Sequence, residues 1–196
     1  MARTGRRPGD SGSREAILAA ARDLFAEHGY EGASMRAIAA SAGVDAALVV
    51  HFFGSKANLL AAAIDWPFEP AEAIPRLLAG GPDEVGKRVV KLMVSTWDRE
   101  GGRHAVLTLL RSAATEPRAA ELMHEFTQTR LFAPLLAELG SDQPELRGEL
   151  AASQLIGLGM ARYVLRFEPL ASMAPDGVVA LLAPAVQAAL TGPLPG

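Results

Sequence analysis

The sequence predicts an all-α protein with a small N-terminal helical domain and a larger C-terminal helical domain. Apolar residues recur at helical spacing through most of the chain, and no segment of any length alternates as a β-strand does. Glycine and proline residues divide this pattern into about nine helices. Hydrophobic residues make up 49% of the 196 residues and charged residues 21%, a composition typical of a globular protein that can bury a sizeable core.

The first predicted helix runs from residue 13 to about residue 28. Ser13 is a suitable N-cap, because its hydroxyl can accept a hydrogen bond from a free backbone N–H. One face of this helix is apolar and comprises Ile17, Leu18, Ala21, Leu24 and Phe25. His28 and Gly29 suit its C-terminal end, since glycine readily adopts the left-handed conformation that terminates many helices.

Residues 34–53 have the spacing of a helix-turn-helix motif. Ala39 is small enough for two helices to cross closely, Gly43 allows a turn with positive φ, and Val49 is apolar. The motif predicts a DNA-binding domain over residues 13–60, with residues 34–53 as its core.

Charge is distributed unevenly along the chain. Residues 1–60 hold seven Lys or Arg against six Asp or Glu, whereas residues 61–196 hold twelve against sixteen. Residues 1–12 are expected to form a disordered basic arm, in which three arginines precede any acidic residue: Arg3, Arg6 and Arg7. Such an arm can enter the minor groove beside a helix-turn-helix, although a solubilising tail is the simpler alternative.

Polar caps and prolines delimit the other helices. Ser34, Asp45 and Ser55 are the expected N-caps of the second, third and fourth helices. The later helices are expected at 55–66, ended by Pro67 and Pro70; 83–99; 103–116, after a break at Gly101 and Gly102; 117–139, kinked or divided at Pro134; 144–167, with Leu146, Leu150 and Phe167 inside; and 176–190. Together they form the second domain, residues 61–196.

Several function classes have no support in the sequence. There is no cysteine, the four histidines lack metal-ligand spacing, and no nucleophile motif is present. We therefore expect no enzyme, no cofactor and no metal site. The N-terminal arginines are not followed by the apolar core of a secretory signal, and no segment reaches the ~20 apolar residues of a membrane span. A cytoplasmic protein without a membrane partner is expected.

The N-terminal fifty residues resemble the DNA-binding domain of TetR/AcrR-family transcriptional repressors. The matching residues are His28, Gly29 and Tyr30; Ser34; Ile38 and Ala39; Ala42, Gly43 and Val44; His51, Phe52 and Phe53; Gly54, Ser55 and Lys56; and Leu59 and Leu60. Downstream only the length and the helical layout agree with the family. The resemblance implies a homodimer that binds a palindromic operator on double-stranded DNA and is released from it by a small, lipophilic effector.

The resemblance also implies which residues contact DNA. Ser34 and Lys56 would hold phosphates, and the third helix would face the major groove. The DNA-binding candidates outside the basic arm are Ser34, Met35, Arg36, Asp45, Ala46, Ala47, Leu48, Val50, His51 and Lys56. Val50 stands where the family usually has a phosphate-binding tyrosine, and Ala47 where it often has glycine. His51 is adjacent and can partly substitute for the lost contact.

The third helix is poor in hydrogen-bond donors, although direct readout normally uses Arg or Lys on guanine and Asn or Gln on adenine. Arg36 is the residue near the groove that can make a bidentate guanine contact. We therefore expect Arg36 to select guanine while Ala46, Ala47 and Val50 pack on thymine methyl groups. The alternative is that Arg36 contacts only phosphate.

Candidates for a ligand pocket and a dimer interface come from the second domain. Adaptable, aromatic or polar residues that suit a lipophilic ligand with one polar end are Met93, Trp97, His104, Arg111, Met123, Phe126, Met160 and Tyr163. Many of these would equally be ordinary core or surface residues. The dimer candidates lie on the last two long helices and are Gln154, Gly157, Ala161, Leu182 and Val186.

Two other functions remain open from the sequence. The chain could be a helical small-molecule-binding or enzymatic protein with a vestigial DNA-binding domain, which the Val50 substitution favours. It could also be a DNA-binding regulator that responds to a protein partner and not to a ligand.

Overall fold

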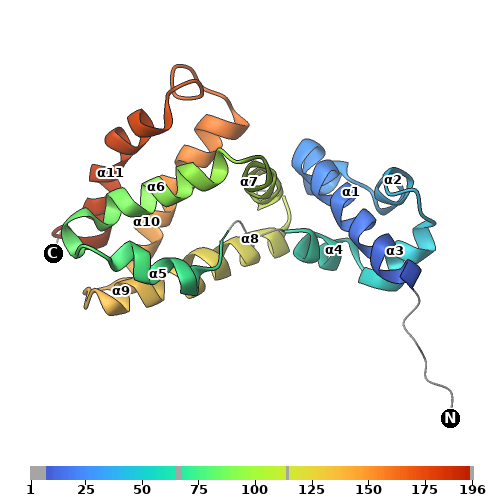
Figure 1. The fold of residues 1–196 in the computed structure, drawn as a ribbon, viewed down its shortest axis with the longest axis horizontal. Helices are drawn as coiled ribbons and strands as arrows, with labels where there is room; N and C mark the ends of the chain where they lie inside the picture. Colours follow the sequence, from blue (N-terminus) through green and yellow to red (C-terminus); the bar gives the residue numbers. More distant parts are fainter. Residues whose placement is uncertain (1–7, 65–67, 114, 195–196) are drawn as a thin grey trace, which may run out of the picture.

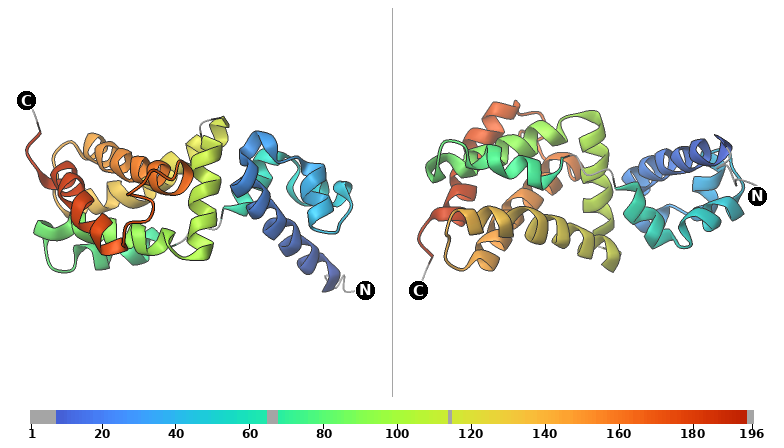
Figure 2. Two further views of the ribbon diagram at one scale, coloured as in Figure 1. Left: turned by 90° about the horizontal axis from the view of Figure 1, so that it is seen from above. Right: turned by 60° about the horizontal axis from the view of Figure 1, so that its bottom comes forward.

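The computed structural model describes residues 8–64, 68–113 and 115–194, and within these ranges it contains helices and loops but no strand (Figure 1). The helices form two bodies that lie end to end along the long axis of the molecule. The head comprises α1–α4, and the larger body comprises α5–α11. In both views of Figure 2, the head lies beside one end of the body only. The all-α fold is confirmed.

The elements of the two bodies follow one another without long loops. The head contains α1 (Pro8–Gly32), α2 (Met35–Ser41), α3 (Ala46–Phe53) and α4 (Lys56–Ala63). The body contains α5 (Pro70–Leu78), the short 3₁₀ helix η1 (Pro82–Glu84), α6 (Val85–Trp97), α7 (Glu100–Ala113), α8 (Pro117–His124), the π-helical segment η2 (Glu125–Phe132), α9 (Ala133–Glu138), α10 (Pro144–Gly159), the π-helical segment η3 (Met160–Val164) and α11 (Pro175–Thr191).

Local sequence signals fix the helix-turn-helix. The Ser34 hydroxyl accepts a hydrogen bond from the Ala37 N–H at 3.1 Å, and the Asp45 carboxylate accepts one from the Ala47 N–H at 2.7 Å. Ser55 caps α4 in the same way, and Gly43 has a φ of 67° in the turn. The three predicted caps and the positive φ are confirmed.

The head differs from its prediction at both ends. α1 begins at Pro8, so Ser13 lies inside the helix and is not its cap. Proline suits the first helical turn, because its missing N–H would have no partner there. At the other end α4 stops at Ala63, and its apolar side chains are buried in the head core with Ile17 and Phe25.

The body has a core of its own, built mainly by α6, α10 and α11. α6 and α11 cross at Gly86, whose N–H donates to the Gln187 side-chain oxygen at 2.7 Å. A Cβ at Gly86 would lie 2.6 Å from the Gln187 Cα. A glycine is therefore required for this crossing.

Several predicted boundaries in the body are wrong. α5 begins at Pro70, which starts a helix at its N1 position instead of only ending the previous one. α7 begins at Glu100 and runs through both glycines that were expected to break it. Glycine is needed at position 102, because any Cβ there would collide with the Thr96 carbonyl. The helix expected to end at Phe167 ends earlier, and Phe167 is 58% exposed.

No single helix of the described ranges is long and apolar enough to cross a membrane. The α2 and α3 pair reaches that length and hydropathy only together, and it is bent by 111°.

Replacing Gly86 by alanine should lower the free energy of unfolding by about 1–3 kcal/mol, as expected for overpacking at a tight crossing. Chemical denaturation at one fixed protein concentration measures this change. Gly12→Ala is the matched control, because a Cβ there meets nothing within 4 Å and α1 is helical at that point. If both substitutions stabilise the protein equally, the close crossing is not a constraint.

Candidate functional site

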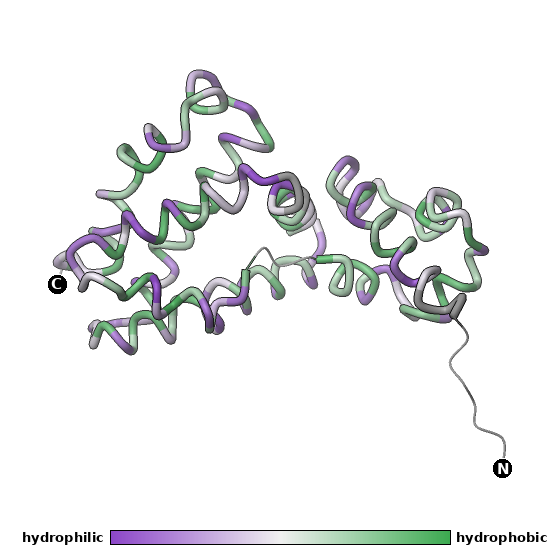
Figure 3. The backbone as a smooth tube through the Cα atoms, viewed as in Figure 1, coloured by the Kyte–Doolittle hydropathy of each residue, from purple (hydrophilic) through white to green (hydrophobic). Residues whose placement is uncertain are grey.

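The α2–α3 face of the head is exposed and mostly apolar. Ala47, Val50 and His51 of α3 are exposed, and Val50 leaves 51% of its surface open. Val49, on the other side of the helix, is completely buried. Figure 3 colours α3 as hydrophobic over most of its length. This surface offers methyl groups for contact and few hydrogen-bond donors.

Arg36 projects from the start of α2 on this face. It is exposed and makes no hydrogen bond or ion pair with any residue that the structure describes. The nearby Asp45 carboxylate is already used as the N-cap of α3. Arg36 is therefore available to an acceptor outside the chain, whereas Asp45 has a structural role.

Lys56 lies at the start of α4, beside the end of α1. Its amine is 4.3 Å from the centre of the Tyr30 ring and 3.5 Å from the Glu31 carbonyl oxygen. Burial raises the pKa of Tyr30, and the Glu116 carboxylate of α8 adds to this effect. The Lys56 amine is thus held in place by a neutral aromatic ring.

The structure adds one cation to this surface. Arg14, which the sequence reasoning missed, stacks on Phe53 with its guanidinium carbon 5.5 Å from the ring centre. It is exposed beside the end of α3, but no local sequence pattern marks it.

The remaining predicted DNA-binding residues are less exposed or lie outside the described part of the chain. Met35, Ala46 and Leu48 on the α2–α3 face are half-buried. The three arginines of the predicted basic arm lie outside the described residues: Arg3, Arg6 and Arg7.

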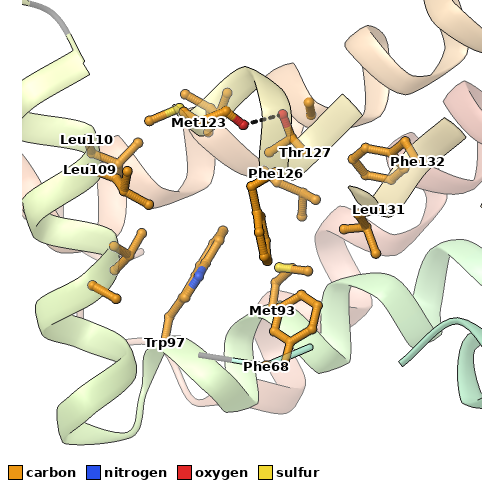
Figure 4. A pocket seen from close by; sticks show the side chains of 15 residues that line it. Phe68, Met93, Trp97, Leu109, Leu110, Met123, Phe126, Thr127, Leu131 and Phe132 are labelled. Atoms are coloured by element: carbon orange, nitrogen blue, oxygen red, sulfur yellow. Dashed lines mark hydrogen bonds between the residues drawn. The ribbon is translucent and has the colours of Figure 1, made fainter. Parts of the chain in front are cut away.

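A cavity of about 70 Å³ lies inside the body, bounded by α6, α7, η2 and α10. Figure 4 shows aromatic and sulfur-containing side chains meeting across it. Its walls are Phe68, Met93, Trp97, Ala105, Val106, Leu109, Leu110, Met123, Phe126, Thr127, Leu131, Phe132, Ala152, Leu155 and Ile156. Four of the residues proposed from the sequence are among them: Met93, Trp97, Met123 and Phe126.

The wall formed by η2 has an unusual backbone. The Ala133 N–H at its end donates to the Gln128 carbonyl, five residues earlier, as in a π-helix. The following Pro134 has no N–H and cannot continue the usual α-helical pattern. The proline that was expected to kink or divide the helix instead follows a widened segment that bears Phe126 and Phe132. π-helical segments are frequent at functional sites.

Three of the other ligand candidates, Tyr163, Met160 and Arg111, do not line the cavity. Tyr163 packs edge-on against Trp97 with ring centres 6.0 Å apart, and its hydroxyl donates to Asp98 at 2.9 Å. Burial raises the pKa of Tyr163 to about 12, and the hydrogen bond to Asp98 makes the second-largest contribution. Met160 belongs to the surrounding core. The side chain of His104 lies outside the described residues.

Arg111, which was expected to contact a ligand, instead contacts the head. It lies on α7, and its guanidinium donates to the Ala26 carbonyl and, at 3.0 Å, to the Glu27 carbonyl of α1. These carbonyls belong to the last turn before Gly29, whose φ of 69° interrupts the helix. Arg111 therefore joins the body to the head and does not contact the cavity.

A shallow groove between α10 and α11 contains most of the dimer candidates. Gln154, Gly157, Ala161 and Leu182 line it. The prediction for Val186 is wrong, because its side chain is completely buried in the core of its own chain. Large apolar side chains on the same two helices are instead exposed: Leu146 by 43%, Leu150 by 38% and Leu181 by 70%.

Two family models match the chain. Residues 17–63 match that of bacterial regulatory proteins of the tetR family, and residues 83–190 match the tetracyclin repressor-like C-terminal domain. The first match spans α2–α4 and most of α1, and so includes the helix-turn-helix. The second spans α6–α10 and nearly all of α11, and so includes every described cavity-lining residue except Phe68.

Individual relatives agree with these matches. A TetR-family regulator of Streptomyces coelicolor A3 is 39% identical, with a TM-score of 0.67 over 95% of this chain and 98% of that one. UidR of Escherichia coli K12, an HTH-type transcriptional regulator, is 32% identical over 111 residues, 57% of each chain. AcnR of Corynebacterium glutamicum, an HTH-type transcriptional repressor, is 48% identical over 50 residues, 26% of this chain and 27% of AcnR.

The matched stretches span from about a quarter to somewhat over half of these two curated relatives. The S. coelicolor structure, by contrast, is matched over nearly its whole length. The family consists of transcriptional regulators and not of enzymes, in agreement with the sequence prediction. With both of its domains matched, the chain belongs to the TetR family of bacterial transcriptional regulators.

Proposed function

We propose that this chain is a cytoplasmic, homodimeric repressor that binds a palindromic operator and releases it when a small lipophilic molecule occupies the cavity. One observation carries the proposal: α7 lines the cavity and also holds the head through Arg111. The printed descriptions of AcnR and UidR as a transcriptional repressor and regulator support the same class of function.

The exposed α2–α3 face supports DNA contact through a small number of groups. Arg36 has no partner among the residues that the structure describes and can bind guanine through two hydrogen bonds, while Val50 and Ala47 can pack on thymine methyl groups. Ser34 and Lys56 would hold the phosphates on either side. Because few cations lie on the head, the affinity should depend on salt only moderately, by ~0.9 log units per phosphate neutralised.

Exposed apolar surface on α10 and α11 supports the homodimer. Leu181 lines the groove that contains the small residues Gly157 and Ala161. Leu146 and Leu150 are exposed on α10. Small residues allow helices of two copies to approach closely, so four helices would form a bundle across a two-fold axis. A two-fold dimer matches the symmetry of a palindromic operator.

α7 supports a route from the cavity to the head. Ala105, Val106, Leu109 and Leu110 line the cavity, and Leu109 also belongs to the head core. The hydroxyls of Thr108 and Ser112 are buried without a hydrogen-bond partner in the described residues. A ligand that displaces α7 would therefore break few side-chain hydrogen bonds besides those of Arg111, and the head would move with the helix.

Replacing Arg36 by alanine should weaken operator binding by about 1–3 kcal/mol, the value of one bidentate base contact. The loss should shrink on operators whose contacted guanine is already replaced. Fluorescence anisotropy with the chain's own upstream DNA and single-base variants measures both effects. Arg166→Ala, an exposed arginine of the body, is the control. An equal loss on every operator variant would mean that Arg36 contacts only phosphate.

Replacing Leu181 by aspartate should convert the dimer to monomers of 20.6 kDa, because the charge would be buried in the interface. Sedimentation or light scattering measures the mass. Ala180→Asp is the matched control, since it adds the same charge on the same helix but faces the separate groove beside α6. Monomers from both variants, or dimers from both, would contradict this interface.

Replacing Arg111 by alanine should weaken operator binding about fivefold or more, a typical size for coupling between sites. The reason is that the last turn of α1 loses its donor from α7. Binding of the neutral dye N-phenyl-1-naphthylamine to the free protein should stay within about twofold, as Arg111 does not line the cavity. Arg118→Ala, which removes a surface pair with Glu121, is the control. Unchanged operator affinity in Arg111→Ala would contradict the proposed route.

A further inference from the structure

Among the residues that the structure describes, none that lines the cavity has an ionisable side chain. All fifteen side chains that line it among the described residues are aliphatic, aromatic or sulfur-containing, except for one threonine. Charged groups beside the lining residues are already paired. The Arg130 guanidinium, 5.8 Å from the centre of the Phe126 ring, forms an ion pair with Glu69 at 2.8 Å. The Arg162 guanidinium binds the carbonyls of Leu170 and Met173. A charged group placed in the cavity would therefore lose its hydration without gaining a partner.

The indole of Trp97 provides a free hydrogen-bond donor at the cavity. No hydrogen bond is found for its N–H among the residues that the structure describes. Tyr163 packs against the ring and is itself anchored by its hydrogen bond to Asp98. Figure 4 shows the indole, with its nitrogen, standing across the cavity from Phe126. The ring is thus held in place while its N–H lacks an acceptor.

The other polar group in the wall is already used as a donor. The Thr127 hydroxyl donates to the Met123 carbonyl at 2.8 Å, as the dashed line in Figure 4 marks. Among the described lining residues, a ligand would therefore find one free donor, the Trp97 N–H, and otherwise an apolar surface. Burying that donor without an acceptor would cost binding free energy.

We propose that the cavity selects an uncharged, largely aromatic molecule with one hydrogen-bond acceptor, and that the Trp97 N–H binds this acceptor. Because the cavity encloses only about 70 Å³, such a molecule enters as the walls move apart. This inference rests on the proposed function, in that it assumes the cavity to be the effector site. Trp97 then determines specificity within the site, while Met93, Phe126 and Leu155 supply apolar contact. Anions and cations of the same size are excluded by the cost of their desolvation.

Two naphthalene dyes test the exclusion of charge on the unmodified protein. N-phenyl-1-naphthylamine is neutral, and 8-anilinonaphthalene-1-sulfonate has the same rings with one sulfonate. Calorimetric titration should give at least about tenfold tighter binding of the neutral dye, since an uncompensated buried charge is costly. Equal affinity, tighter binding of the sulfonate, or no binding of the neutral dye would overturn the proposal.

A second pair of ligands tests the donor. 2-Acetylnaphthalene carries one carbonyl acceptor, and 2-isopropenylnaphthalene has the same shape with carbon in place of that oxygen. The protein should prefer the ketone by about two- to tenfold, as one hydrogen bond contributes. Trp97→Phe should reduce this ratio to near one without weakening the binding of the hydrocarbon more than about twofold. Retained binding of the hydrocarbon shows that the variant keeps its pocket.

Tyr163→Phe is the matched control, because it removes one polar atom from the neighbouring ring but leaves the indole N–H. Its ketone preference should remain that of the unmodified protein. A preference that survives in Trp97→Phe, or disappears in both variants, would overturn the role of Trp97. Operator affinity of each protein without ligand is measured in parallel, so that failure of DNA binding is distinguished from failure of this ligand class.

Discussion

Arg111 joins the two bodies of this protein, and the proposed regulation depends on that contact. Its guanidinium binds the last carbonyls of α1 before Gly29, on the side of the head that faces α7. The same helix places Leu109 in the head core and Leu110 in the body core. A helix that belongs to two cores cannot move without changing both, because packed interiors deform little. This shared helix is the basis for the proposed coupling between the cavity and the DNA-binding face.

The DNA-binding face itself is unusual in having so few donors. Val50 is exposed where a donor would be expected, and Asp45 is committed to capping its own helix. In the proposed readout, bases are contacted by Arg36 and by methyl groups. Lys56 is oriented by the Tyr30 ring. Such a surface combines one directional base contact with recognition of DNA shape. Only a few base pairs of the operator should therefore determine its sequence specificity.

The head could be predicted from sequence in detail, and the body only in outline. The caps at Ser34 and Asp45 and the turn at Gly43 act within a few residues, so their signals are local. The position of Arg111 depends on carbonyls of α1 that lie far away along the chain. The start of α7 at Glu100 and the widened η2 segment have no local sequence signal that we recognised. Val186 was assigned to the surface because helical spacing identifies an apolar face but not which neighbour covers it. The Trp97 donor also becomes evident only when the other cavity walls are known.

Reciprocal coupling between the cavity and the operator is the central claim, and one titration measures it directly. N-phenyl-1-naphthylamine is titrated into the free protein and into the protein saturated with its operator. If α7 couples the two sites, the dye binds the operator complex more weakly, by the same factor by which it weakens operator binding. Equal dye affinity for the free and the operator-bound protein would contradict the account.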